Sequence, residues 1–422
     1  MRVMKWSMIA LAVSAGTSQL ALASAQDESK GFIEDSQLNV KTRMLYFSRD
    51  FRNNPAGTQS RVEETGLGFL GTYESGFTQG TVGFGVDAIG MLGLKLDSGR
   101  GRAGTGLFPE GSDGRSQDDY SEGGAAVKLR ISNTVLKFGN QFTALPVFAT
   151  DDSRLLPEVA EGALITSNEI KGLTLHAGHF TAMNAQAQTF RDSLHLTEAN
   201  IVGGTYAFTD SLSTSLYYSK VEDYWRKYYG NINWAVPISD KQGLVFDFNI
   251  YNTKGDGAEF VKAYDGASLD NTAFSLSAAW NIGAHTFTIV HQRVHGDGDY
   301  AYGVDGGGTV FLGNSVARSD FNAEDEKSWQ ARYDLNFAEF GVPGLTFMTR
   351  YVRGTDANVA GTSNGKEWER DIDIKYVLQE GPAKDLSFRV RQATYRSADG
   401  VYYGSPSLDE LRLIVEYPLS IL

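Results

Sequence analysis

The sequence predicts an all-β chain that closes into a transmembrane antiparallel β-barrel. Three observations carry this prediction: apolar and polar residues alternate with a period of two, long and short connections follow one another, and the last segment has one wholly apolar face. Helical periodicity is nowhere sustained. A period of two sends successive side chains to opposite faces of a strand, as a wall between lipid and a polar lumen requires.

The final segment, residues 411–422, shows the alternation most cleanly. Its even positions include Arg412 and Glu416, whereas its odd positions are all apolar: Leu411, Leu413, Val415, Tyr417, Leu419 and Ile421. In a soluble sheet this apolar face would meet a second layer, and in a barrel it would meet lipid. Because an open edge is costly in hydrocarbon, a barrel strand here must pair with the first strand.

Composition excludes several classes of protein. The 422 residues contain no Cys, which rules out a disulfide scaffold and thiolate zinc sites. No run of about 18 apolar residues follows the N-terminus, so helical membrane spans are not expected. The formal net charge of -13 argues against a nucleic-acid partner.

The N-terminal residues 1–25 have the features of a secretory signal peptide. Arg2 and Lys5 precede an apolar stretch around residues 8–15, and Ala23-Ser24-Ala25 provides an A-x-A site, so we expect cleavage before Gln26. The mature chain, residues 26–422, is then a single exported barrel domain.

Alternating segments recur along the mature chain. In the first, the apolar face runs from Leu38 to Tyr46, with Lys41, Arg43 and Arg49 on the opposite face. The same pattern predicts strands over residues 82–96, 127–131, 244–250, 329–337, 345–351, 372–378 and 386–390.

The connections differ in length in a regular way. Short ones with ordinary turn residues lie at 209–211, 239–243, 341–344 and 381–383. Long polar ones lie at 97–124, 253–271, 296–327 and 354–366. Short turns on one rim and long loops on the other are typical of outer-membrane barrels, and roughly 20–24 residues per strand and connection give about 16–20 strands.

Several segments resemble the OprD family of pseudomonad porins. They are GFIEDS from Gly31, TYESGFTQGTVGFGVDA from Thr72, SRLLP from Ser153, FDFNIY from Phe246, EKSWQARYDLN from Glu326, GVPGLTFM from Gly341, GPAKDLSFR from Gly381 and RLIVEYPLSIL from Arg412. The resemblance implies a monomeric barrel of 18 strands in the outer membrane of a Gram-negative bacterium, with an inward-folded loop that narrows the pore. Its implied partners are outer-membrane lipid, the barrel-assembly machinery and small carboxylate solutes, with carbapenem antibiotics admitted by some members.

Basic residues are expected to line the lumen. Parity places Arg350, Lys375, Arg389, Arg391 and Arg412 opposite the apolar faces of their strands. Lys375 and Arg389 are near the turn at Gly381 and so low in the pore, with Arg391 above them and Arg412 and Arg49 higher still. A staggered column of guanidinium groups can pass a carboxylate from one group to the next. Each group offers two parallel hydrogen-bond donors, and none is the only binding site.

The resemblance extends this column. The family's basic ladder matches Arg49, Arg61, Lys375, Arg389, Arg391 and Arg412, plus Arg154 on the constricting loop. The alternative is that these side chains only pair with acids of the wall such as Asp371, Asp373 and Glu416.

The expected constricting loop is residues 140–162. It follows a strand that ends near Phe138, has no clean alternation, and carries Pro146, Pro157 and the pair Asp151-Asp152. We expect it to fold into the lumen and present Arg154, the alternative being an ordinary exposed loop.

Opposite the ladder, the family has an acidic pocket with a tyrosine. Tyr302 and Asp320 match it, but the second acid falls at Gly308 and a neighbouring tyrosine becomes Arg318, with Asp305 a possible replacement for the missing acid. The resemblance therefore implies that the pore recognises the carboxylate of a solute, and it does not imply that the pore recognises an ammonium group.

Several enzyme-like motifs occur, but the residues around them do not fit an active site or a metal site. We expect no catalytic activity, cofactor or metal. The GxGxxG of residues 99–104 precedes no helix, the GxSxG of residues 361–365 lies in a polar loop, and His291 and His295 are about 13 Å apart on a strand. A serine-peptidase assignment also attaches to the family, whose residues match His179 and Asp223 but meet Thr309 at the serine. A barrel hydrolase is therefore the alternative function, which solute-driven swelling of liposomes without hydrolysis would count against.

Overall fold

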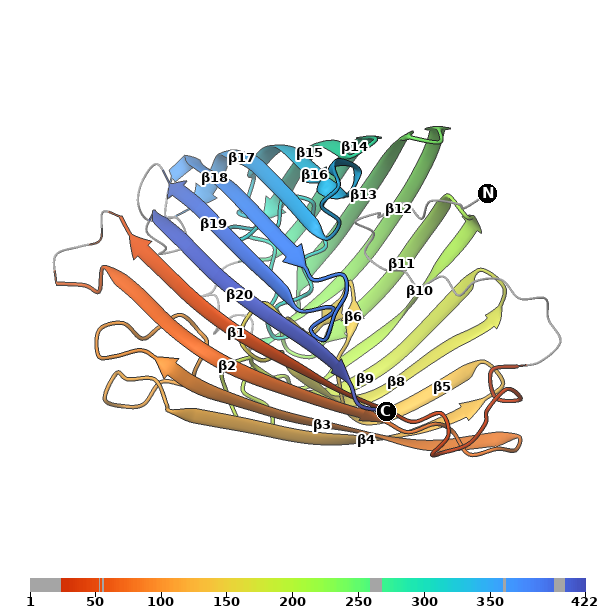
Figure 1. Ribbon diagram of the computed structural model, residues 1–422. Helices are drawn as coiled ribbons and strands as arrows, with labels where there is room; N and C mark the ends of the chain where they lie inside the picture. The colour runs from red at the N-terminus through yellow and green to blue at the C-terminus, as the bar shows by residue number, and fades with distance from the viewer. Residues whose placement is uncertain (1–23, 53, 55–56, 259–267, 360–361, 398–406) are drawn as a thin grey trace.

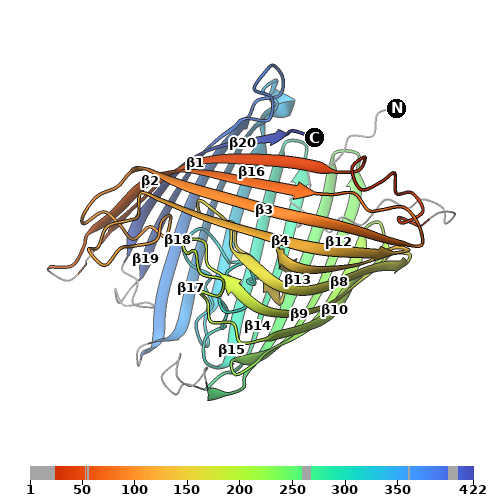
Figure 2. The ribbon, with the colours of Figure 1, turned by 90° about the horizontal axis from the view of Figure 1, so that it is seen from below.

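The chain forms one closed antiparallel barrel in the computed structural model, which describes residues 24–52, 54, 57–258, 268–359, 362–397 and 407–422 (Figures 1 and 2). The predicted number of 18 wall strands is confirmed. They are β1 (Gln37–Phe51), β2 (Arg61–Glu74), β3 (Val82–Asp97), β4 (Asp119–Ile131), β5 (Thr134–Gln141), β8 (Val159–Ile170), β9 (Leu173–Asn184), β10 (Ala199–Thr209), β11 (Leu212–Val221), β12 (Trp225–Ser239), β13 (Gln242–Gly255), β14 (Asp270–Ile282), β15 (His285–Asp297), β16 (Lys327–Asn336), β17 (Leu345–Val359), β18 (Thr362–Val377), β19 (Ser387–Ser397) and β20 (Leu408–Ser420).

Closure joins the first strand to the last, as the amphipathic final segment predicts. β1 pairs antiparallel with β20 from Asn39 opposite Ser420 to Phe51 opposite Leu408. The Ile421 amide also donates to the Leu38 carbonyl at 2.8 Å. The start of β1 and the end of β20 therefore lie on one rim, and no sheet edge is left at this seam.

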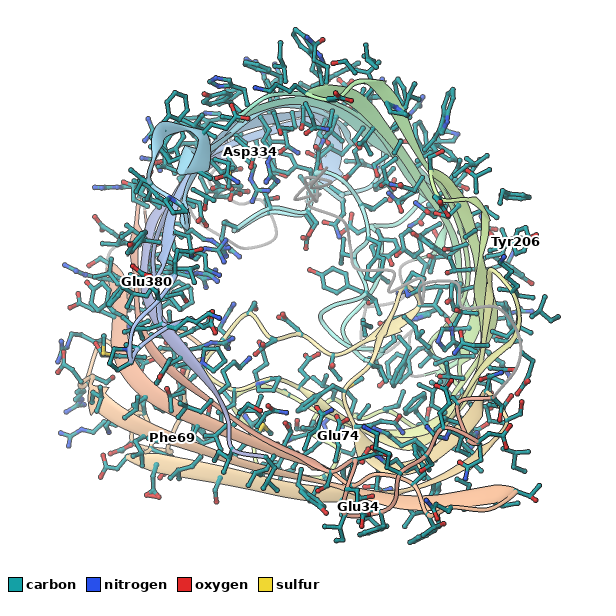
Figure 3. All side chains as sticks on the ribbon, turned by 45° about the vertical axis from the view of Figure 1, so that its right-hand side comes forward. Glu34, Phe69, Glu74, Tyr206, Asp334 and Glu380 are labelled. Carbon is teal, nitrogen blue, oxygen red and sulfur yellow. The ribbon has the colours of Figure 1, made fainter. Side chains whose placement is uncertain are left out.

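The two faces of the wall differ as the alternation predicts. Outward side chains such as Leu216, Ile289 and Trp329 are well exposed, because lipid rather than protein covers them. Figure 3 shows Tyr206 pointing away from the barrel, while other side chains crowd inward around an open centre. Aromatic residues mark both ends of the outward face, with Trp280, Phe287, Tyr376 and Phe388 near the short turns and Tyr228, Trp329 and Tyr351 near the long loops.

The rims differ in the lengths of their connections. Short turns join β10 to β11, β12 to β13, β14 to β15 and β18 to β19, and the turn before β17 contains a short 3-10 helix, η1 (Phe337–Phe340). That turn ends at Gly344, whose φ of 88° and whose approach to the Val377 carbonyl leave no room for a Cβ. By the usual orientation of such barrels, this is the periplasmic rim.

One predicted long loop is wrong. The stretch 354–366 continues as strand, since β17 runs to Val359 and β18 starts at Thr362, with Ala357 paired to Gly365 beyond an irregularity in the ladder. Its Gly, Asn, Ser and Thr residues suit a hairpin arm standing in water as well as they suit a loop. Composition alone therefore did not separate the two.

Two connections fold into the barrel. Residues 142–158 contain the small hairpin of β6 (Ala144–Leu145) and β7 (Phe148–Ala149), and Phe148 stacks on the wall residue Phe180 with ring centroids 4.3 Å apart. The Tyr251 hydroxyl of β13 donates to the Pro146 carbonyl at 2.9 Å. The inward placement of this loop is thus confirmed, and we call residues 142–158 the constriction loop. Residues 298–326, the second inward loop, share one buried apolar cluster with it and the wall.

The predicted signal peptide lies almost wholly outside the described residues, which begin at Ser24. In the described part of the chain, no helix is long and apolar enough to span a membrane.

Candidate functional site

Three arginines surround one phenyl ring where the constriction loop meets the β1–β20 seam. The ring belongs to Phe47 of β1, which is fully buried. The guanidinium carbons of Arg412, Arg49 and Arg154 lie 4.4, 4.7 and 5.3 Å from its centroid. Arg412 comes here because it is the cross-strand partner of Phe47. Cations are attracted to the face of an aromatic ring, so Phe47 gathers like charges that would otherwise separate.

This cluster holds more positive charge than negative. Glu410, with 1% of its side chain exposed, accepts from Arg49 Nε at 2.8 Å and Arg412 Nε at 2.7 Å. Arg154 donates to the Ser153 hydroxyl at 2.9 Å and has no carboxylate partner among the described residues. Burial and then the charges of Arg412 and Arg49 lower the pKa of Arg154. An arriving anion would relieve that repulsion.

Further basic residues continue down the wall toward the periplasmic rim. Arg391 and Arg389 of β19 share Asp373, at 3.0 and 2.7 Å. Lys375 is the cross-strand partner of Arg389 and forms no ion pair within the described residues. Arg350 pairs with Asp371 at 2.6 Å on the neighbouring strands.

The predicted heights need one correction. Arg391 and Arg412 are direct cross-strand partners, so they form a single rung rather than two steps. These heights depend on the register between β19 and β20, and the sequence alone does not show where each of these strands ends and the loop between them begins. The two expectations for these side chains, a column of cations in the lumen and pairing with acids of the wall, both hold in part. The cations do line the lumen, and five of them pair with acids of the wall: Arg49, Arg350, Arg389, Arg391 and Arg412.

Arg61 is not brought to this site. It is the cross-strand partner of Asp50, whereas Val62 is the partner of Arg49, so Arg61 faces outward. Its side chain is 52% exposed and contacts Glu63 and the Tyr46 hydroxyl. The assignment of Arg61 to the ladder is therefore wrong, because a one-residue difference in register reverses the face.

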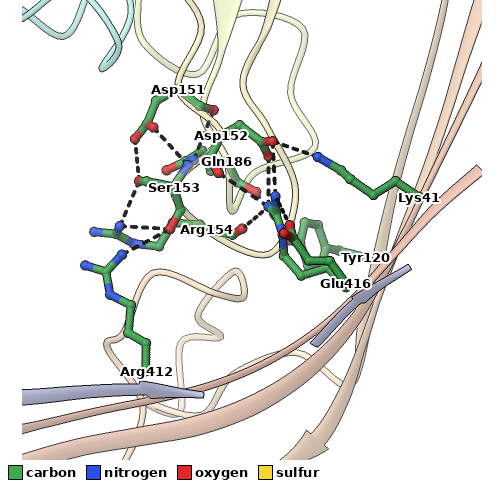
Figure 4. Close-up of polar contacts among 10 residues, drawn as sticks. Lys41, Tyr120, Asp151, Asp152, Ser153, Arg154, Gln186, Arg412 and Glu416 are labelled. Atoms are coloured by element: carbon green, nitrogen blue, oxygen red, sulfur yellow. Dashed lines mark hydrogen bonds and ion pairs between the residues drawn. The ribbon is translucent and has the colours of Figure 1, made fainter. Parts of the chain in front are cut away.

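Arg43 is a luminal residue that the predicted ladder leaves out. It donates through Nη1 to Asp152 Oδ1 at 2.8 Å and to the Arg154 carbonyl at 2.5 Å, and through Nε to Glu416 at 2.7 Å (Figure 4). Lys41 also reaches Asp152, at 2.7 Å. Arg43 thereby ties the constriction loop to the wall beside Arg154. Parity already placed it on the face of Arg49, but nothing local in the sequence pointed to Asp152 as its partner.

The opposing pocket forms within the second inward loop. The Tyr302 hydroxyl and the Ser315 hydroxyl both donate to the Asp320 carboxylate. Burial raises the pKa of Asp320, although these two hydrogen bonds and the charge of Arg318 partly offset it. The predicted pair Tyr302 and Asp320 is thus assembled, with an arginine close enough to counter its charge.

The chain matches the model of the "outer membrane porin, OprD family" over residues 30–421. It is 50% identical to Porin D of Pseudomonas aeruginosa over 455 aligned positions, which cover all of both chains. The chain belongs to the OprD family of outer-membrane porins. It is a substrate-specific channel of the Gram-negative outer membrane.

Other relatives agree with this assignment. The porin-like protein GalP of Pseudomonas putida is 34% identical, with 93% of this chain and 94% of GalP covered. The crystal structure of P. aeruginosa OprD is 47% identical with a TM-score of 0.79, covering 96% of this chain and all of that one. OccK9 (OpdG) of P. aeruginosa is 37% identical with a TM-score of 0.86, covering 93% of this chain and all of that one.

The missing acid of this OprD-family pocket has no replacement at Asp305. Asp305 is fully buried and accepts from Lys227 Nζ at 2.6 Å and Trp225 Nε1 at 3.1 Å, so it balances an internal cation. Gly308 donates its amide to the Ala149 carbonyl of the constriction loop at 3.1 Å. A Cβ there would lie 2.9 Å from the Thr150 carbonyl oxygen, so an acid at this position requires the two loops to move apart.

The alternative of a barrel hydrolase gains no support. Thr309 is buried and donates to the Gly306 carbonyl at 2.8 Å, while His179 contacts Asn200 on the outward face at 2.9 Å. No hydrogen bond joins Thr309, His179 and Asp223 within the described residues. The part of the chain that the structure describes also contains no group of acidic or His side chains arranged to hold a metal ion.

Proposed function

We propose that this porin passes small carboxylate-bearing solutes by passive diffusion, and that the arginines around Phe47 recognise the carboxylate. The observation that carries the proposal is the charge of this cluster. Arg49 and Arg412 share the single acid Glu410, and Arg154 on the constriction loop has no acidic partner in the described chain. A guanidinium offers forked donors that match a carboxylate, and in a narrow lumen its field is only partly screened.

The path below the cluster is the second part of the proposal. A carboxylate leaving Arg412 meets Arg391 as its cross-strand partner, then Arg389 two residues along the same strand, then Lys375. Cα atoms two residues apart on a strand are roughly 6–7 Å apart, so one long side chain reaches the solute before the previous one releases it. Asp373 shares its charge between two arginines, which keeps each site weak enough for release.

The opposing pocket supports solutes without a required ammonium group. Asp320 has a raised pKa, Arg318 lies near it, and Gly308 stands where the family has a second acid. We infer that neutral amino acids, small peptides, and mono- or dicarboxylates pass more readily than arginine or lysine. A relative, OpdK, has been solved with vanillate, which is itself a carboxylate.

Reconstitution with matched variants tests this function. Arg154→Ala combined with Arg412→Ala removes two members of the cluster, while Arg332→Ala removes a luminal arginine that pairs with Asp334 away from Phe47. In liposome swelling, the double variant should slow a carboxylate at least tenfold, since each lost charge-assisted contact contributes about 1.5–3 kcal/mol. A neutral sugar of equal size should change little, and Arg332→Ala should resemble the parent protein. Equal slowing of sugar and carboxylate would show that the arginines only shape the pore.

Several finer points belong to the same proposal. We expect residues 1–25 to be removed before Gln26, the barrel to act as a monomer, and its insertion to need the barrel-assembly machinery. We expect carbapenem antibiotics, which carry a carboxylate, to follow the same path. The reconstituted protein should let liposomes swell in an ester or peptide solute without hydrolysing that solute, as expected of a channel rather than an enzyme.

A further inference from the structure

The outward face of β18 carries a concentration of positive charge near the extracellular rim. Residues 366–370 read Lys-Glu-Trp-Glu-Arg, and alternation separates the two signs. Glu367 and Glu369 are buried toward the lumen, where they accept from Ser319 of the second inward loop. Lys366 and Arg370 are exposed on the outward face, on either side of Trp368. The strand thus sends its acids into the pore and its cations toward the membrane.

The neighbouring strand adds a third cation. Arg353 of β17 is the cross-strand partner of Trp368 and is also exposed. Lys366 and Arg370 are its diagonal neighbours, at Cα separations of roughly 7–8 Å, which long side chains span. The three basic residues therefore converge on one area of the outer wall.

Aromatic rings frame these cations. Trp329 is the other cross-strand partner of Arg353 and is 58% exposed, and Tyr351 is the partner of Arg370 and is 44% exposed. The rings of Tyr351 and Trp368 lie 5.8 Å apart. We call Arg353, Lys366 and Arg370, together with Trp329, Tyr351 and Trp368, the Arg353 patch.

The basic residues of the patch lack acidic partners. Within the described residues, Arg353 and Lys366 form no ion pair, and Arg370 makes only long hydrogen bonds of 3.5 and 3.4 Å to Gln392 and Thr394. Several other cations on this rim do have acids: Lys220 with Glu222, Arg226 with Asp256, Lys254 with Asp270, Arg191 with Glu161 and Arg102 with Asp97. In a chain of net charge -13, unbalanced cations gathered in one place indicate an anionic partner from outside the chain.

The height of the patch matches the outer headgroup region. β17 starts at Leu345 on the periplasmic rim, and Arg353 is eight residues further along. At about 3.3 Å per residue and a tilt of roughly 40°, this places Arg353 on the order of 20 Å above that end. The apolar band of such barrels is about 25 Å tall, and Trp and Tyr favour its borders. The patch therefore lies near the upper border of this band, level with the aromatic rings of Trp329, Tyr351 and Trp368, where the lipid headgroups begin.

We propose that the Arg353 patch binds the phosphate groups of a phosphorylated glycolipid in the outer leaflet of the outer membrane. Arginine suits phosphate because its planar fork donates two parallel hydrogen bonds, and Lys366 adds a point charge. Three cations spread over two strands favour a headgroup with more than one phosphate. The exposed faces of Trp329 and Tyr351 flank them at the level of the headgroup sugars.

Binding of purified lipid A tests the proposal, with the full-length barrel in detergent. The patch variant is Arg353→Ala with Lys366→Ala and Arg370→Ala. The control variant is Lys220→Ala with Arg226→Ala and Lys254→Ala, which removes equal charge from paired residues of the same rim. Native mass spectrometry should show diphosphorylated lipid A bound on the order of tenfold more weakly by the patch variant and nearly unchanged by the control. Unchanged single-channel conductance verifies that both variants are folded, because these residues face away from the lumen; the milder Arg353→Gln replaces the triple variant if it does not assemble.

Three results would overturn the proposal. Equal weakening in both variants would mean that total surface charge and not the patch attracts the lipid. Full binding by the patch variant would place the lipid elsewhere. Equal affinity of the parent protein for phosphatidylglycerol, or for lipid A without phosphates, would show that recognition does not depend on several phosphates. None of these results bears on carboxylate transport, so the inference fails or stands apart from the proposed function.

Discussion

At the scale of single residues, Phe47 and Gly308 matter as much as the charged side chains. Phe47 supplies the apolar face on which three guanidiniums gather, within 4.4–5.3 Å of its centroid. Gly308 has no side chain, and the second inward loop can therefore lie against Ala149 of the constriction loop. Neither residue has a charge, yet together they set where the charges of the pore stand.

Replacing Phe47 with leucine should loosen the arginine cluster while nearly preserving buried volume. We expect a stability loss of under about 1.5 kcal/mol, as for volume-conserving apolar exchanges. Carboxylate flux relative to sugar flux should fall several-fold, because cation–π attraction of about 0.5–2 kcal/mol per arginine is lost. Phe69→Leu on the neighbouring β2 is the matched control, and liposome swelling is the measurement. An unchanged flux ratio would deny Phe47 this organising role.

Restoring an acid at Gly308 should not create a cation-selective pocket. Its side chain would start 2.9 Å from the Thr150 carbonyl oxygen, so Gly308→Asp should push the constriction loop away and raise single-channel conductance. Gly90→Ala serves as the control, since a Cβ at Gly90 meets nothing within 4 Å. Improved lysine uptake at unchanged conductance would contradict the steric argument.

At the scale of elements, the constriction loop is held by charge as well as by packing. Arg43 reaches Asp152, Glu416 and the Arg154 carbonyl, and Lys41 reaches Asp152, so a single acid joins the loop to β1. Burial alone would raise the pKa of Asp152, but the contacts with Arg43 and Lys41 outweigh it and hold the pKa below its usual value. A carboxyl with a lowered pKa contributes stability above its usual pKa and loses it as the pH falls through the lowered one.

The loop should therefore stay in place over the whole neutral and mildly acidic range. Conductance in planar bilayers should be constant from pH 8 to pH 5 and rise only when the pH falls below the ordinary Asp pKa of about 3.9 to the lowered pKa of Asp152, where this carboxylate is protonated. Asp152→Asn should show the raised conductance and reduced carboxylate preference at every pH. A variant indistinguishable from the parent protein at pH 7 would mean that packing alone positions the loop.

At the scale of the whole molecule, an acidic protein maintains one positive cluster on its lumen wall. The net charge is -13 and β18 sends Glu367 and Glu369 toward the lumen, but the seam of β1 and β20 gathers arginines from both ends of the chain. Solutes at the cluster respond to the few charges within reach, because the Debye length is about 8 Å at physiological salt. Local charge and overall charge can thus have opposite signs.

A higher salt concentration should separate solute selection by local charge from solute selection by pore shape. Raising the ionic strength to about 1 M shortens the Debye length to about 3 Å, so carboxylate flux should fall several-fold while sugar flux stays constant. The comparison uses one preparation of liposomes with impermeant salt on both sides. A carboxylate-to-sugar ratio that ignores salt would mean that pore shape selects the solute.

Much of the barrel is determined by the sequence itself, because a strand's two faces depend on a period of two residues, which is a local property. Alternation placed Arg350, Lys375, Arg389, Arg391 and Arg412 on the luminal face, and the apolar face of residues 411–422 required closure against the first strand. The irregular stretch around Pro146 and Pro157 indicated an inward loop.

Only the tertiary structure decided the relations between distant segments. Register made Val62 and not Arg61 the neighbour of Arg49, and a shift of one residue reverses every face, so position alone misplaced Arg61. The bond of Arg43 to Asp152, the packing of Gly308 on Ala149 and the pairing of Asp305 with Lys227 each join residues far apart in the chain. Such contacts depend on how loops meet inside a closed wall, and no local pattern of residues encodes that meeting.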